Sequence, residues 1–188
     1  RGLFINTNTN QVVARGYEKF FNFREVDETS PESISNLKYP ITGYLKENGY
    51  LGLIGYDEES DDFVFASKSS LESDHAIWLK ELFYETVDGS KLDLFKTTLK
   101  RNNICMVFEV INQEKSPHII ECNEKKLVLL DIIYRQPRFE KYPFRKMLAF
   151  ANEFGLEPKK KALTFKSFED FMKWLNKAEG YEYKYKYQ

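Results

Sequence analysis

Lys46 is the residue whose type and surroundings best suit a nucleophile. It opens the pattern Lys-x-x-Gly, which ends at Gly49 within "LKENGYLGLIGYD" (residues 45–57). A lysine that attacks phosphorus must first lose its proton, and burial and neighbouring cations favour that loss. We interpret the segment as an apolar hairpin with the lysine at its mouth. A surface lysine before a turn is the plainer alternative, because Lys-x-x-Gly is common by chance.

Lys184 and Lys186 form a second candidate group near the end of the chain. They lie in "YEYKYKYQ" (residues 181–188), where lysines and tyrosines alternate. Alternation with a period of two puts the lysines on one face of a strand and the tyrosines on the other. Two cations on one face could hold a triphosphate, and a solvated edge strand protected by lysines is the alternative.

Glu109 interrupts the apolar run "CMVFEVI" (residues 105–111), which is typical of a central strand. An ionised carboxylate is costly there without a partner, and a sugar hydroxyl, a cation or a metal could provide one. An acid that faces water at the end of the strand is an equally good interpretation.

Basic residues stand beside aromatic rings in "ARGYEKFFN" (residues 14–22), where Arg15 and Lys19 accompany two phenylalanines. The combination suits a base stacked on a ring, with phosphates held by cations. A hydrophobic turn with solvated basic neighbours is the alternative. Lys68 stands in "ASKSS" (residues 66–70), where we expect a strand to meet a helix start; free N–H groups there attract phosphates, or the segment is simply a helix cap.

Composition bounds the remaining possibilities. The chain has 188 residues, which favours one domain with one core, and its 28 basic and 29 acidic residues nearly cancel, so an anion site must be a local cluster. Two cysteines without a pattern predict a reducing compartment, the cytoplasm by default. His75 and His118 lack metal-ligand spacing and are interpreted as structural or surface residues. No apolar run is long enough to predict a membrane span.

The elements that would position these residues are mostly antiparallel strands. We expect a strand pair in residues 1–16, turned by polar residues 6–10, followed by a surface loop at "DETSPESISN". A three-strand meander is expected at residues 41–46, 50–56 and 62–67. A helix should start near Ser69, which has capping-box spacing to Glu72, and should stop before Asp88.

The second half should contribute two central strands and two amphipathic helices. "ICMVFEVI" and "KLVLLDIIY" are β-type apolar runs, and they follow another short helix. Helical spacing runs from Phe144 to Phe154, with Gly155 as the C-cap, and a second such helix follows Ser167. The order of strands and helices predicts an α+β fold with mainly antiparallel sheets and flanking helices.

The order of the motifs resembles a known family. "RGLF", "ARGYEKFFN", "KENG", "SKSS", "FEV", "LVLLDI", "EGY" and "KYK" follow one another as in covalent nucleotidyltransferases, specifically the bacteriophage RNA ligase 1 family and the ligase domain of fungal tRNA ligases. The resemblance covers nearly the whole chain. It implies a covalent nucleotidyltransferase (ATP-grasp-like) fold and an adenylyltransferase domain over residues 1–188.

The resemblance also assigns roles. Lys46 would take AMP from ATP through a phosphoramide bond, Glu179 would assist a Mg²⁺ ion, and Lys184 and Lys186 would contact the α-phosphate. Glu109 would hold the ribose and Phe21 would line the nucleotide pocket. The residues that the resemblance places in the nucleotide site are Arg1, Lys19, Phe21, Leu45, Gly49, Lys68, Glu109 and Gly180.

Two departures from the family pattern stand out. Tyr50 follows Gly49 where phage members carry a small polar residue, and only three residues separate Gly180 from Lys184. Either this connection is truly short or residues are missing from it. We favour missing residues, because the chain opens at Arg1 without an initiator Met, as if trimmed, and we expect the family's C-terminal substrate-specificity domain to be absent as well.

The expected activity is ATP-dependent RNA ligation through lysyl-AMP. The expected substrates are RNA 5′-phosphate and 3′-OH ends, with cleaved tRNA as one candidate, and RNA repair or tRNA splicing as the setting. Two alternatives stay open. One is a catalytically inactive nucleotide- or RNA-binding module, and the other is an mRNA capping guanylyltransferase, against which "EKFFN" argues. The sequence does not indicate an oligomeric state.

Overall fold

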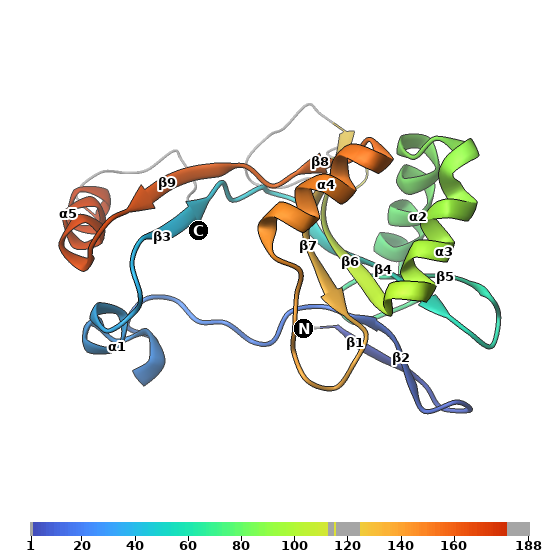
Figure 1. Cartoon of the computed structure of the whole chain (residues 1–188), viewed down its shortest axis with the longest axis horizontal. Helices are drawn as coiled ribbons and strands as arrows, with labels where there is room; N and C mark the ends of the chain where they lie inside the picture. The colour runs from blue at the N-terminus through green and yellow to red at the C-terminus, as the bar shows by residue number, and fades with distance from the viewer. Residues whose placement is uncertain (1, 113–114, 116–124, 180–188) are drawn as a thin grey trace. The chain divides into compact units, whose positions relative to one another are not determined.

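The computed structural model describes residues 2–112, 115 and 125–179. The chain forms two compact units (Figure 1). The first, called the sheet unit, comprises Arg1–Glu18 and Glu47–Pro158. The second, called the ribbon unit, comprises Lys19–Lys46 and Lys159–Gln188. The chain therefore crosses between units directly after Lys46.

A five-stranded sheet is the centre of the sheet unit. Its order is β5 (Asp62–Ala66), β4 (Tyr50–Asp57), β6 (Ile104–Asn112), β7 (Lys125–Tyr134) and β8 (Glu157–Pro158). All neighbours are antiparallel except β7 and β8, which are parallel. The apolar runs expected as central strands are β6 and β7, so that prediction is confirmed.

Three helices cover one face of this sheet: α2 (Asp74–Thr86), α3 (Leu92–Asn102) and α4 (Phe144–Phe154), with the short 3-10 helix η2 (Gly89–Lys91) between the first two (Figure 1). Aromatic rings dominate this core. The centroid of Phe95 lies 5.0 Å from that of Phe83 and 4.7 Å from that of Phe154. Gly155 ends α4 in a left-handed conformation, as predicted, with φ at 69°.

A two-stranded antiparallel sheet, formed by β1 (Leu3–Asn6) and β2 (Gln11–Arg15), packs on the opposite face of the five-stranded sheet. Ala14 of β2 lies in a small core with Leu53 and Val107. The approach is close, because a Cβ added at Gly55 would lie 1.9 Å from the carbonyl oxygen of Val13. The predicted strand pair at the start of the chain is confirmed.

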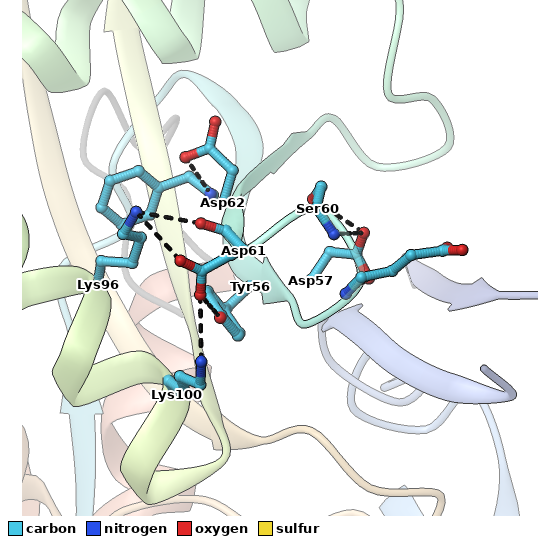
Figure 2. A network of polar contacts seen from close by, with 9 residues as sticks. Tyr56, Asp57, Ser60, Asp61, Asp62, Lys96 and Lys100 are labelled. Carbon is cyan, nitrogen blue, oxygen red and sulfur yellow. Dashed lines mark hydrogen bonds and ion pairs between the residues drawn. The ribbon is translucent and has the colours of Figure 1, made fainter. Parts of the chain in front are cut away.

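The acidic turn between β4 and β5 is held by a polar network (Figure 2). The Asp61 carboxylate accepts a hydrogen bond from the Tyr56 hydroxyl and lies 3.1 Å from Lys100 Nζ of α3. Lys96 Nζ donates to the Asp61 carbonyl at 3.0 Å. These contacts tie the turn to the helical face of the sheet.

Because of this network, the stability of the folded chain depends on pH. The hydrogen bond from Tyr56 and the nearby Lys100 lower the pKa of Asp61 below 3.8. A carboxyl whose pKa is depressed in the folded state stabilises it above the unfolded pKa, and loses that effect as the pH falls through the folded pKa. We expect Asp61→Asn to lower Tm at pH 7 by about 2 °C or less, since the site is exposed. The difference from wild type should shrink below about pH 4. Glu58→Gln, in the same turn, is the control, and an equal Tm deficit at pH 7 and pH 3 would contradict the assignment.

The ribbon unit contains the antiparallel pair β3 (Ile41–Tyr44) and β9 (Lys161–Phe165), which lie side by side in Figure 1. The helix α5 (Phe168–Glu179) packs on β9, where the ring of Phe165 lies 5.5 Å from that of Phe171. Two short helices, η1 (Asp27–Thr29) and α1 (Pro31–Ser35), complete the described part of this unit.

Three sequence predictions are wrong in detail. Residues 41–44 do not continue the meander, because their partner is β9 rather than β4. The loop expected at "DETSPESISN" contains η1 and α1, the latter capped by Ser30. Helix α2 begins at Asp74 with Ser73 as its N-cap, so the capping box expected at Ser69 does not form.

None of the described helices is long and apolar enough to cross a membrane.

Candidate functional site

Glu109 holds the segment that follows Lys46. It stands opposite Leu51 in the β4–β6 pair and is half-buried, and its Oε1 accepts a hydrogen bond of 2.9 Å from the N–H of Gly49. A Cβ at position 49 would lie 2.1 Å from the carbonyl oxygen of Val110. The close approach of two strand backbones therefore requires glycine here. Gly49 and Glu109, far apart in sequence, belong to one local arrangement.

A second acid, Asp131 of β7, lies on the same face of the sheet as Glu109 and has only 3% exposure. The Tyr17 hydroxyl donates to Asp131 Oδ2 at 2.6 Å, and Lys141 Nζ lies 3.2 Å from the same oxygen. Burial raises the pKa of Tyr17, and the charges of Asp131 and Glu109 raise it further. Tyr17 therefore stays protonated at neutral pH and can act only as a neutral hydroxyl. The sequence analysis selected neither Tyr17 nor Asp131 as a site residue. Asp131 nevertheless interrupts the apolar run "LVLLDI", as Glu109 interrupts "CMVFEVI", and could have been found by the same feature.

Arg15 serves the fold rather than a phosphate. It has 7% exposure, and its Nη1 donates to the carbonyl oxygens of Gln136 and Pro137. Its guanidinium also stands 5.5 Å from the centroid of the Phe139 ring. Both interpretations of Arg15 from sequence, a phosphate ligand and a solvated cation, are wrong, because the loop after β7 supplies backbone acceptors that sequence spacing does not reveal.

In the ribbon unit, Lys19 and Phe21 come together. Lys19 Nζ lies 4.5 Å from the centroid of the Phe21 ring. Phe21 also lines a cavity of about 560 Å³, whose other walls come from β3, β9 and α5 and include Ile41, Leu163 and Trp174. The size is in the range of small-molecule pockets, and the walls are mainly apolar.

Lys46 follows β3 by two residues, and its side chain is exposed. The preceding residue, Leu45, is 39% exposed, and its N–H donates to the carbonyl oxygen of Lys160 at 2.9 Å. The expected apolar hairpin around Lys46 does not exist, because β3 pairs with β9 and the chain crosses between units after Lys46. The predicted burial of this amine is therefore wrong.

Lys68 lies in the bend after β5, exposed and well ahead of the first residue of α2, so its predicted place at a helix start is wrong. The segment is shaped by serines, since Ser73 Oγ donates to Ser67 Oγ at 3.0 Å. The backbone of this segment also lies close to Gly2, which belongs to the motif "RGLF". A Cβ at Gly2, whose φ is 77°, would lie 3.3 Å from the Lys68 carbonyl oxygen.

Tyr50, one of the departures from the family pattern, packs against an aromatic group. Its ring lies 4.3 Å from that of His75 and 6.5 Å from that of Trp78, centroid to centroid. His75 is thus part of a ring cluster, in line with its structural interpretation.

The remaining predicted site residues lie outside the described residues: Arg1, Gly180, Lys184, Lys186 and the side chain of Glu179. The strand expected at residues 181–188, and His118, lie outside them as well. Within the described ranges no group of three or more His, Cys, Asp or Glu side chains could hold a metal ion. Mg²⁺ in phosphoryl-transfer sites takes many of its ligands from phosphates and water and needs only one or two carboxylates.

The fold is that of ATP-dependent RNA ligases. The archaeal ATP-dependent RNA ligase in form 2 superposes with a TM-score of 0.62 over 94% of this chain and 45% of its own, at 14% identity. Form 1 gives a TM-score of 0.59 over 92% of this chain and 45% of its own, at 15% identity.

The sequence places the chain more narrowly. A family model described as RNA ligase matches residues 1–187, so the chain belongs to that RNA ligase family. The tRNA ligase of Candida albicans is 28% identical over 95% of this chain and 24% of its own length. The tRNA ligase 1 of Schizosaccharomyces pombe is 29% identical over 82% of this chain and 22% of its own. The chain thus spans about a quarter of the length of these relatives.

Proposed function

We propose that this chain is the adenylyltransferase domain of an ATP-dependent RNA ligase that seals RNA 5′-phosphate to 3′-OH ends. The observation that carries the proposal is the hydrogen bond from Gly49 to Glu109. It joins the segment after the candidate nucleophile to the acid that the family resemblance assigns to the ribose. The family match over residues 1–187 supports the same assignment.

The first step would be attack of Lys46 on ATP. The neutral Nζ forms a bond to the α-phosphorus, the bond from that phosphorus to the bridging oxygen breaks, and pyrophosphate leaves with the electron pair. The proton that Lys46 must lose goes to solvent. Bound Mg²⁺ would neutralise phosphate oxygens, with Glu179 as its ligand by resemblance. The Glu109 carboxylate can accept a hydrogen bond from a ribose hydroxyl.

Two further transfers would complete ligation. AMP passes from Lys46 to the 5′-phosphate of an RNA end, and a 3′-OH then attacks that phosphate and releases AMP. The protein contributes positioning and fixed charges, as in other phosphoryl transfers. We propose a cleaved tRNA as the RNA, because two similar proteins are tRNA ligases.

Mass spectrometry of the intact chain tests the proposal. Incubation with Mg²⁺ and ATP should add one AMP, whereas GTP should add nothing, because the site is expected to select adenine. Addition of GMP would indicate a capping enzyme, and no adduct with either nucleotide would indicate a binding module. Paired tRNA halves with 5′-phosphate and 3′-OH ends should then be sealed faster than unstructured RNA with the same ends.

A further inference from the structure

The connection between β7 and α4 has backbone pairing of its own and can be followed in Figure 1 from the end of β7 to the start of α4. Lys141 forms an antiparallel bridge with Ile133 near the end of β7. The N–H of Tyr142 donates to the carbonyl oxygen of Ile132 at 2.8 Å. The chain therefore turns after β7 and runs back along the end of that strand before α4 begins.

The turn of this connection is fixed from the core. The buried Arg15 donates from Nη1 to the carbonyl oxygens of Gln136 and Pro137, and its guanidinium stands 5.5 Å from the centroid of the Phe139 ring. A loop held in this way keeps one backbone conformation. The side chains that it exposes can therefore meet a partner without a large cost for ordering the loop.

Positive charge is concentrated here, in a segment that we call the basic segment (residues 135–146). It contains five basic residues and one acid, Glu140, whereas the whole chain has 28 basic and 29 acidic residues. Arg138, Arg145 and Lys146 are exposed, and in the described part of the chain none of the three forms an ion pair. A local cluster of this kind attracts anions even though the chain as a whole is nearly neutral.

Two of these charges oppose the dipole of the helix that carries them. Arg145 and Lys146 are the second and third residues of α4, and its first turn contains no acid. Glu153 stands next to the last residue of the same helix. A helix dipole favours acids at the start and cations at the end, which is the reverse of this order. The basic residues therefore do not serve the stability of α4, and an anionic partner would offset their unfavourable position.

We infer that Arg138, Arg145 and Lys146 contact the phosphate backbone of the RNA substrate, an inference that rests on the proposed function. The three cations are spread from the turn of the connection to the first turn of α4. Such spacing suits a chain of phosphates better than a single anion. Contacts to the backbone carry no sequence information, so this surface binds RNA irrespective of its sequence.

The part of the connection that runs back along β7 leads from this surface toward the proposed nucleotide site. Lys141 Nζ lies 3.2 Å from Asp131 Oδ2, and Asp131 shares a face of the sheet with Glu109. RNA on the basic segment would therefore lie beside the face that carries the acid assigned to the ribose. The surface holds the RNA near the site of transfer and takes no part in the attack of Lys46 on ATP.

A triple variant, Arg138→Ala with Arg145→Ala and Lys146→Ala, tests the inference. Fluorescence anisotropy with labelled single-stranded RNA of mixed sequence, without ATP, gives Kd from about 50 to about 300 mM salt. Each phosphate contact to a single strand contributes about 0.7 to the slope of log Kd against log salt concentration. The triple variant should lower that slope by about 2 and raise Kd at about 150 mM salt by about 10- to 100-fold.

The matched control is a second triple variant, Lys38→Ala with Lys80→Ala and Arg101→Ala. It removes the same charge from exposed positions elsewhere and should raise Kd by less than about 3-fold. Arg138→Lys combined with Arg145→Lys keeps both charges and should retain most of the affinity.

Thermal melts separate binding from folding. Since Arg145 and Lys146 oppose the helix dipole, the Tm of the first triple variant should not fall. Its rate of AMP-adduct formation without RNA should equal that of wild type, because the basic segment takes no part in that step.

The outcomes separate the two proposals, because the adduct is measured without RNA and the affinity without ATP. If wild type binds RNA through these residues but forms no AMP adduct, the proposed function fails while the RNA surface is confirmed. If wild type is adenylylated but binds no RNA at about 50 mM salt, or if the two triple variants have equal Kd, only the inference fails. Slow adduct formation by the folded first triple variant would assign the three cations to the nucleotide step and would also overturn the inference.

Discussion

Lys46→Ala should abolish formation of the AMP adduct. If Lys46 Nζ is the atom that bonds to phosphorus, alanine leaves no group in its place, and the rate should fall by at least about 10³-fold, as for removal of other covalent nucleophiles. Lys46 is exposed, so its loss opens no cavity and the Tm should stay near that of wild type. Intact-mass measurement after incubation with ATP and Mg²⁺ reads the result directly.

Two further variants separate the nucleophile from its charge. Lys46→Arg keeps the positive charge, but a guanidinium is not deprotonated in proteins, so it should be as inactive as alanine. Lys38→Ala removes another exposed lysine of the ribbon unit and should be adenylylated normally. Peptide mapping of the wild-type adduct should find AMP on Lys46. AMP on any other lysine would disprove the assignment.

Gly49→Ala should impair both folding and adenylylation. The added Cβ would lie 2.1 Å from the carbonyl oxygen of Val110, far inside contact distance, so β4 and β6 would have to separate locally. We expect a loss of about 1–3 kcal/mol in unfolding free energy, the range for overpacking. The shift should also break the hydrogen bond to Glu109, so adenylylation should slow by at least about 10-fold even where the variant is fully folded.

Gly89→Ala is the matched control, because nothing lies within 4 Å of a Cβ added there. Chemical denaturation should show little change for this variant, and its adenylylation rate should equal that of wild type. A Gly49→Ala variant that behaved like Gly89→Ala would show that β4 and β6 do not approach as closely at this point as the structure indicates.

The central elements follow from local pattern alone. Strands β6 and β7 are apolar on both faces, so both faces must be buried under other parts of the protein. Helix α4 repeats its apolar residues at helical spacing and ends at a glycine that accepts a left-handed conformation. Glu109 could be singled out because an acid in such a strand is costly without a partner.

The environment of Lys46 could not be predicted in the same way. The sequence predicts a hairpin from the neighbouring β-type segments at residues 41–46 and 50–56. In the structure β3 pairs instead with β9, more than a hundred residues away. Short-range pattern does not report strand partners, because pairing depends on which edges the assembled chain leaves open. The same limit hid the acceptors of Arg15 and the contact between Tyr17 and Asp131.

The sequence by itself determined the order of the motifs, the buried strands and helices, and the residues whose chemistry suits nucleotidyl transfer. Local propensity, burial preference and residue type are properties of short segments, and for that reason they can be read along the chain. Only the tertiary structure decided that Gly49 is held by Glu109, that Arg15 is buried, and that the N–H of Leu45, beside Lys46, donates to the carbonyl oxygen of Lys160. These relations join residues distant in sequence, and they exist only once strand pairing has brought the backbones together.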